Sequence, residues 1–389
     1  MPTQYEIYLC RDTGERLMLL SEYFELQYQI VQHETGFCHI VVAGNFDPAY
    51  LRPDYKVAIW RRPEGGTLTL EDVYMIRYIR RFTTADGKRR CELVGANGNS
   101  ILVDRMPRTS IGSSTKCWCG NSITGYADNV MKATVRYALT DFPTVPPCIQ
   151  ASYFGVAADT SQGASFKKTI KYRPLADECT ARAQTSTSRG KTILWHVVAL
   201  SETKYEFRTY LNQIGQDRSW PDGYNPILAT VENGMMAEPE YIWDGIEARN
   251  CIHALGAYYS SPPEARMRAT AEDKLMGARN ALSKYSHRES FIDLGTSIDT
   301  SDSAMEEEAL DALEESYAKE NFTFTLQDTA SMRYGRDWHF GDKITAFYAD
   351  RYYTCRIRGV LLTKDAPDRP ESVAVDMDII PVTDPEITS

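Results

Sequence analysis

The feature that most constrains the fold is an alternation of apolar and polar residues, with a period of two, along the first hundred positions. Side chains of a β-strand point to its two faces in turn, so each alternating run predicts a strand with one buried face. Asp86-Gly87 marks a short hairpin, because it accepts the positive φ of a primed turn. We expect antiparallel hairpins of a sandwich or barrel over residues 4–10, 16–20, 24–32, 37–43, 55–61, 73–83 and 88–94.

Helical spacing of apolar residues appears only after residue 125. Ser303 and Glu306 form a capping box, in which each side chain satisfies a backbone amide of the first helical turn, and this predicts the start of one helix. The periodicity predicts helices over residues 128–139, 264–286 and 304–320.

The rest of the chain returns to extended patterns. Residues 143–190 are rich in Pro, Ser, Thr, Gly and Ala and are expected to form loop or weak structure. Residues 191–201 fit a helix or a buried strand equally well. Strands are expected over 205–212, within 226–260, and over 322–327, 343–348, 352–362 and 372–380. The order predicts an α+β, mainly β fold class.

Composition excludes several function classes. The 389 residues carry 43 basic and 53 acidic side chains, a net charge of −10 that disfavours nonspecific binding of nucleic acid. The longest apolar run, residues 193–200, contains His196 and is far shorter than a membrane span, so no membrane anchor is predicted. The N-terminus lacks a signal-peptide pattern. We therefore expect a protein made in a cytoplasm, with its nine cysteines as reduced thiols.

The sequence predicts no catalytic or metal-binding motif. Cys117 and Cys119 lack a second ligand pair, so they are interpreted as loop thiols. Cys38 and His39 lie on opposite faces of a strand, which argues against joint ligation with His33. The six histidines are spread singly, and no serine-nucleophile, P-loop or dinucleotide-binding pattern occurs. No enzyme, cofactor or metal is therefore predicted, although paired carboxylates for glycoside hydrolysis stay open because their spacing is spatial.

Two charged segments have a simple interpretation as solvated faces. The predicted hairpin around Asp86 carries six basic residues, which could also contact phosphate or an acidic partner: Arg77, Arg80, Arg81, Lys88, Arg89 and Arg90. The helix over residues 304–320 has a strongly acidic outer face opposite an apolar stripe.

Several phrases resemble, in order, the tail-hub proteins of long-tailed bacteriophages, the siphophage relatives of the central hub of contractile tails. Residues 24–43 resemble the opening hairpin, and residues 74–104 the next strand pair. Residues 128–137 are similar to a short helix of that family, and 249–256 (RNCIHALG) to a following strand. The most specific phrase is 334–344 (YGRDWHFGDKI), which resembles the start of the last barrel, with Phe340 where an aliphatic residue is usual. Independently of the resemblance, Gly341-Asp342 before an alternating strand predicts a tight turn in which the Asp342 side chain accepts backbone amides.

The resemblance implies two β-barrel-like domains around a mixed α/β middle. It divides the chain into an N-terminal barrel-like domain (1–125), a mixed α/β domain (126–225), a linking segment of strand and helices (226–321) and C-terminal barrel strands (322–389).

The resemblance also implies a structural virion protein at the tail tip. Such a hub is a homotrimeric ring that joins the six-fold tail tube or distal tail ring to a three-fold spike or fibre, around a channel through which DNA passes unbound. Its implied partners are the distal tail or tail-tube protein, the tape-measure protein and the central spike or fibre protein. Assembly contacts are expected in two segments, at Arg80, Arg81, Asp86 and Gly87 and at Trp338, Phe340, Gly341 and Asp342.

Two other interpretations remain. A β-rich carbohydrate-binding or glycan-depolymerising tail protein would expose tryptophans as sugar platforms, for which Trp60, Trp220, Trp243 and Trp338 are candidates. A hub of a cell-encoded contractile injection machine would share the architecture of the phage protein.

Overall fold

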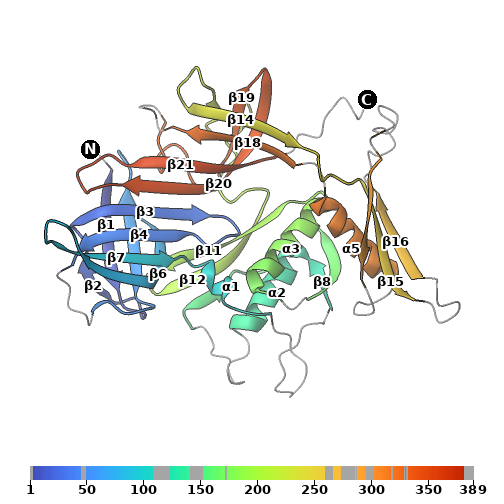
Figure 1. The fold of residues 1–389 in the computed structure, drawn as a ribbon, viewed down its shortest axis with the longest axis horizontal. Helices are drawn as coiled ribbons and strands as arrows, with labels where there is room; N and C mark the ends of the chain where they lie inside the picture. Colours follow the sequence, from blue (N-terminus) through green and yellow to red (C-terminus); the bar gives the residue numbers. More distant parts are fainter. Residues whose placement is uncertain are drawn as a thin grey trace, which may run out of the picture. The chain divides into compact units, whose positions relative to one another are not determined.

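The chain folds into a mainly β structure of two compact units, as predicted for its fold class (Figure 1). The computed structural model describes residues 3–44, 50–107, 122–140, 152–170, 173–258, 266–272, 285, 287–294, 302–316, 319–327, 329 and 332–380. Unit 1 holds residues 1–186, 191–239 and 324–380, and unit 2 holds chiefly residues 240–323. The sequence-based division into four segments stays a prediction, because the boundaries of the two units do not coincide with the ends of those segments.

The largest element of unit 1 is one sheet built from both ends of the chain. Its order is β13-β19-β20-β3-β4-β7-β6-β5-β1-β2, with β21 paired to β20. The N-terminal strands are β1 (Gln4–Cys10), β2 (Arg16–Leu19), β3 (Tyr23–Val31), β4 (Phe37–Ala43), β5 (Lys56–Arg62), β6 (Thr69–Thr83) and β7 (Arg89–Ala96). The others are β13 (Leu228–Ala229), β19 (Lys343–Tyr348), β20 (Arg351–Lys364) and β21 (Ser372–Ile379). These match the alternating runs of the sequence.

β20 joins the two ends of the chain. Its second half pairs with β3, Gly359 opposite Val31 and Lys364 opposite Leu26, while its first half pairs with β19. A strand of 14 residues is long enough to do both, and its pairing with β21 has a register shift between Ile357 and Gly359. Such an irregularity bends a strand and increases its twist. The strands expected in two barrels are thus hydrogen-bonded in a single sheet.

A mixed α/β layer packs on this sheet (Figure 1). It comprises α1 (Ser100–Val103), β8 (Ser122–Tyr126), α2 (Ala127–Leu139), β9 (Phe154–Val156), β10 (Ser165–Thr169), α3 (Leu175–Ser188), β11 (Ile193–Ser201) and β12 (Lys204–Leu211). One buried cluster contains side chains of the large sheet, such as Ala58 and Val73, together with Val135 of α2 and Trp195 of β11. The predicted helix at 128–139 is confirmed, and the ambiguous stretch 191–201 is a strand.

The expectation of loop over residues 143–190 is wrong for the part that the structure describes. β9, β10 and α3 lie within it. Leu175, Cys179 and Ala183 recur every four residues and are buried in the core of unit 1. Small side chains therefore give α3 an apolar face that composition alone did not indicate.

Unit 2 contains a three-stranded sheet covered by one helix. The sheet order is β16 (Arg266–Glu272), β15 (Cys251–Tyr258) and β17 (Glu289–Asp293). α5 (Asp302–Glu315), the predicted helix at 304–320, packs Met305, Ala309 and Leu313 against Ile252 and Ala254. The chain enters this unit in β14 (Met236–Asp244) and leaves it in β18 (Lys319–Leu326), which pair with each other.

The helix expected over residues 264–286 is wrong where it can be assessed. Residues 266–272 form β16, antiparallel to β15. Met267, Ala269 and Ala271 alternate with polar residues, which is the period of two of a strand. In a helix the backbone hydrogen bonds would lie within the segment, whereas here β15 is the hydrogen-bonding partner. Residues 273–284 lie outside the described chain. In the part of the chain that is described, no helix has both the length and the apolar character of a membrane span.

Candidate functional site

The first predicted contact segment forms an exposed hairpin. Arg80 and Arg81 follow each other on β6, and both side chains are exposed. Arg80 lies 3.3 Å from Glu92 on β7, and its guanidinium covers the ring of Phe82. Charge on this hairpin is therefore partly neutralised by its own neighbours, in agreement with a solvated face.

The turn of this hairpin differs from the predicted one. Thr84 and Lys88 close a three-residue loop through the Thr84 amide and the Lys88 carbonyl, 2.9 Å apart. Gly87 has φ +80°, whereas Asp86 is not among the residues with positive φ. The type I′ turn that Asp-Gly favours needs positive φ at both central residues, so the loop is instead the three-residue type with glycine in the left-handed position. Asp86 and Gly87 are exposed at its tip.

The second predicted segment is mostly buried inside unit 1. Trp338, Gly341 and Asp342 are buried, and Phe340 is partly buried with its ring 5.1 Å from that of His196. Gly341 has φ +83°, and a Cβ there would approach the Cβ of Ile214 to 2.5 Å. Glycine is thus required twice, by the backbone angle and by the close approach. Contacts of these residues with another subunit stay a prediction.

Asp342 organises the loop that precedes β13. Its Oδ1 accepts the amide of Gln216 at 2.7 Å, and its Oδ2 accepts the amide of His339 at 2.9 Å. The same Oδ2 accepts Nε of Arg218 at 2.8 Å. The sequence predicted that this carboxylate would accept backbone amides beside a Gly-Asp turn, which is confirmed. It did not predict Arg218, which lies 124 residues away in the chain.

The loop held by Asp342 presents aromatic side chains to solvent. We name the stacked Trp220 and Tyr352 the aromatic patch; their exposed fractions are 45% and 54%, and Tyr224 of the same loop is 65% exposed. Trp220 stacks on Tyr352 of β20 with ring centroids 5.6 Å apart and planes 15° from parallel. The Trp220 amide donates to the Thr345 hydroxyl at 2.9 Å, which fixes the loop to β19. Large exposed aromatic groups on a fixed backbone are typical of binding surfaces.

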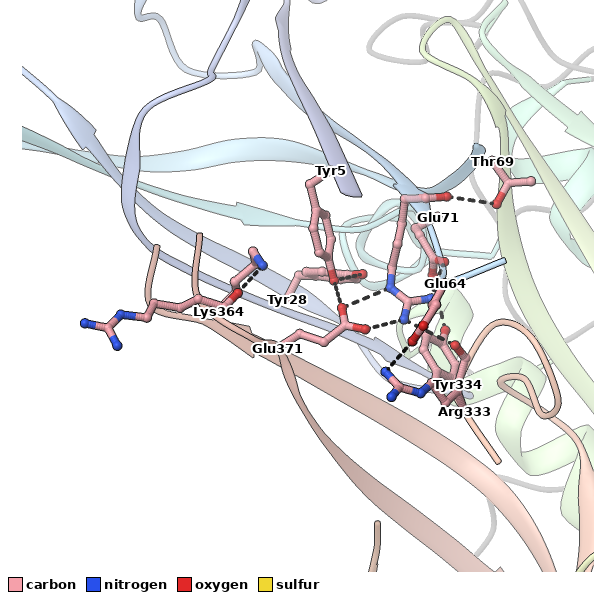
Figure 2. Close-up of polar contacts among 11 residues, drawn as sticks. Tyr5, Tyr28, Glu64, Thr69, Glu71, Arg333, Tyr334, Lys364 and Glu371 are labelled. Carbon is pink, nitrogen blue, oxygen red and sulfur yellow. Dashed lines mark hydrogen bonds and ion pairs between the residues drawn. The ribbon is translucent and has the colours of Figure 1, made fainter. Parts of the chain in front are cut away.

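A buried polar cluster lies elsewhere in unit 1 (Figure 2). Arg61 of β5 is almost fully buried, and its Nε donates to Glu371 Oε2 at 3.1 Å, just before β21. Its Nη2 donates to the Tyr334 carbonyl at 3.2 Å, and Glu71 of β6 lies 3.6 Å from Nη1. The Arg61 guanidinium therefore connects β5 to three other segments. The most distant in sequence is that of Glu371, 310 positions away.

Hydrogen bonds complete this polar cluster. Tyr5 donates to Glu371, and the Tyr334 hydroxyl donates to Glu71 at 3.2 Å (Figure 2). Burial alone would raise the pKa of Glu371, but the hydrogen bond and charge of Arg61 hold that pKa below its usual value. Glu371 therefore stays ionised beside a permanent cation. The sequence gives no signal for this cluster, because its members belong to five separate strands and loops.

The described residues contain little that resembles a catalytic centre. Asp376 of β21 pairs with Arg358 at 2.9 Å, as expected of a charged sheet face. Cys38 is buried while His39 pairs with Glu92 at 3.1 Å, which agrees with their opposite orientation. Cys117 and Cys119 lie outside the described residues. One group of metal-ligating side chains, Cys251, His253 and Glu289, is close enough to hold an ion.

The fold is that of phage tail proteins. The tail protein from Neisseria meningitidis MC58 matches with a TM-score of 0.53 and 11% identity over 97% of each chain. The 43 kDa tail protein of prophage MuSo2 from Shewanella oneidensis matches with 0.53 and 11% over 99% of this chain and 100% of that one. Prophage tail protein gp18 from Listeria monocytogenes EGD-e matches with 0.50 and 9% over 95% and 94%.

At sequence identities of 9–11%, the similarity to these proteins shows a shared fold. It confirms the resemblance that the sequence phrases indicated, over nearly the whole length of three solved tail proteins. No protein-family model and no curated protein sequence matches the chain.

Proposed function

We propose that this chain is a structural protein of a phage or phage-like tail, acting as the tail hub at the tail tip or baseplate. The observation that carries the proposal is the fold match with solved tail proteins, which covers 97% and 99% of this chain. A hub of this kind is a homotrimer that joins a six-fold tube or distal tail ring to a three-fold spike or fibre.

The interior of unit 1 suits a protein with a structural role. β20 hydrogen-bonds to β3, and Arg61 links β5 to the segment before β21. Both connections join the first hundred residues to the last sixty. We propose that the buried, paired charge of Arg61 favours a single arrangement of the elements that it connects. The net charge of −10 suits a channel that DNA traverses without binding.

The aromatic patch is the surface that best fits a contact between subunits. Interfaces are enriched in Tyr, Trp and Arg, and side chains on a fixed backbone lose little conformational entropy on binding. Trp220 and Tyr352 are already stacked, and Asp342 holds the loop through Arg218. Asp342 thus contributes to assembly by positioning the patch. We propose that the exposed Arg80 and Arg81 make polar contacts at the edge of a subunit interface.

Substitution in the aromatic patch tests the proposal. Trp220→Ala is expected to shift the native mass from trimer towards monomer, because it removes an anchor of the contact while leaving the loop's backbone bond to Thr345 intact. Trp243→Ala is the matched control, since Trp243 is also exposed and lies in unit 2. A variant at Trp220 that retains the wild-type trimer would exclude the patch as a subunit contact.

The exposed Trp220–Tyr352 stack also favours a second candidate, a carbohydrate-binding tail protein. A sugar ring stacks on such a face by its C–H groups. Of the other candidate platforms, Trp338 is buried and Trp60 is half-buried beneath Arg16. A glycan screen that detects binding lost on Trp220→Ala, with an unchanged native mass, would favour this second function. The hub of a cell-encoded contractile injection machine would also be a trimer. The genes that neighbour this one in the genome would distinguish such a hub from a phage hub.

A further inference from the structure

Four potential metal ligands gather on one face of the small sheet in unit 2. Cys251 and His253 are two positions apart on β15, so their side chains share a face. Glu289 of β17 pairs in register with Cys251, and His287 precedes it by two residues. Ile252 and Ala254 point to the opposite face, where α5 covers them. The four side chains therefore lie on the face away from α5.

The distances fit tetrahedral coordination. The Cys251 Sγ lies 3.7 Å from the His253 Nε2, and that Nε2 lies 3.8 Å from Glu289 Oε1. All three ligand atoms fall within 4.8 Å of one another. Bonds of about 2.3 Å to sulfur and about 2.0–2.1 Å to nitrogen place tetrahedral ligands roughly 3.3–3.6 Å apart. A contraction of a few tenths of an ångström would bring the Cys251–His253 and His253–Glu289 distances to that spacing.

His287 lies beside this group of three and would have to turn towards Cys251 to act as a fourth ligand. Its Nε2 lies 2.7 Å from Glu289 Oε1, so it reaches the same carboxylate as His253. With a thiolate, a carboxylate and two neutral imidazoles, the ligands carry two negative charges, which a divalent cation neutralises. Mixed sulfur, nitrogen and oxygen donors at tetrahedral spacing suit zinc, whereas calcium and magnesium require oxygen ligands.

The surroundings orient the ligands. The His253 Nδ1 lies 3.1 Å from the Thr270 hydroxyl on β16. When Nδ1–H donates to that oxygen, Nε2 carries the lone pair and faces Cys251 and Glu289. A partner on the second ring nitrogen is the usual accompaniment of a metal-bound histidine.

The backbone around the cluster is fixed in the same way. The Asn250 Oδ1 accepts the Arg288 amide at 2.8 Å, and the Arg288 carbonyl accepts the amides of Asn250 and Cys251. These bonds hold the residue between His287 and Glu289 against the start of β15. They also explain the asparagine in the phrase RNCIHALG, which the sequence resemblance singled out without a physical role.

We propose that Cys251, His253, His287 and Glu289 bind one zinc ion that staples β15 to β17. The site is separate from the aromatic patch and goes beyond the assembly function. It was missed from the sequence because the two ligand pairs are more than thirty positions apart and were interpreted as isolated residues.

The experiment is titration of the full chain, stripped with a chelator, with zinc and with cobalt as a spectroscopic probe. We expect one equivalent of cobalt to give intense visible bands of tetrahedral coordination and a near-ultraviolet thiolate-to-cobalt band, and zinc to displace it and raise the melting temperature. Cys251→Ser should abolish the thiolate band, and His287→Gln should weaken zinc binding. Thr270→Val should weaken it about 10-fold or more without altering the fold.

Controls separate this site from others in the chain. His39→Gln alters a histidine–carboxylate pair that lacks a thiol, and Cys117→Ser/Cys119→Ser removes two thiols outside the described residues. Both variants should bind cobalt like the wild type. Circular dichroism of the stripped Cys251→Ser protein verifies that it folds. Absence of binding by the wild type, or a thiolate band that survives in Cys251→Ser, would overturn the proposal.

Discussion

Single buried polar side chains account for much of the specificity of this fold. Asp342 accepts three hydrogen bonds from two segments, and Asn99 donates to the Val31 carbonyl while accepting the Val197 amide at 2.8 Å. The sequence predicted the Asp342 role because a Gly-Asp turn is a local pattern. It could not predict Asn99 or Arg61, whose partners are brought close only by the tertiary fold.

The buried carboxyl group of Asp72 makes the free energy of unfolding depend on pH. It is fully enclosed between the Val73 amide and the Asn97 side chain, and burial raises its pKa from 3.8 to about 7. Between these two pH values the native chain retains a proton that the unfolded chain has released. The contribution of Asp72 to the free energy of unfolding therefore falls as the pH rises from about 4, and the loss is complete above about 7.

Asp72→Asn removes this titration while keeping the acceptor for the Val73 amide. Relative to wild type, the variant should gain stability as the pH rises from 4 to 8, by at most about 4 kcal/mol. Urea unfolding at several pH values measures the difference. Asp86→Asn is the control, because the pKa of this exposed carboxyl is lowered to about 2 and it is ionised in both states above pH 5. A constant difference between Asp72→Asn and wild type would refute the assignment.

At the level of secondary structure, elements with a strong apolar face were predictable and those stabilised by neighbours were not. Residues 128–139 carry an apolar face and form α2 as expected. α3 was missed because its buried face consists largely of alanine and cysteine, and β16 was mistaken for helix because its alanines suit either structure. In both cases tertiary packing outweighs local preference.

The link between the strands at the two ends of the chain depends on Arg61. Arg61→Met leaves the carboxylates of Glu71 and Glu371 buried without their cation, so we expect a loss of about 3–5 kcal/mol in the free energy of unfolding. Glu371→Gln added to Arg61→Met should recover part of it. Arg11→Met is the control, since its pair with Glu15 is exposed and should cost less than ~1 kcal/mol. Equal losses for Arg61→Met and Arg11→Met in urea unfolding would contradict this account.

At the scale of the whole molecule, the sequence predicted the fold class and the tail-protein resemblance, both of which are confirmed. It could not predict that strands from both ends share one sheet, since pairing between β3 and β20 depends on contacts more than 300 residues apart. Nor could it locate the aromatic patch, because Trp220 and Tyr352 become neighbours only through the placement of the loop on β19.

The native mass of the purified full chain, measured by light scattering with electron-microscope images of the same sample, tests the central claim most directly. The proposed hub predicts a trimer near three times 44.1 kDa that appears as a ring with a central opening. A chain that stays monomeric at every accessible concentration, with no ring formed when tail-tube and spike proteins are added, would contradict it.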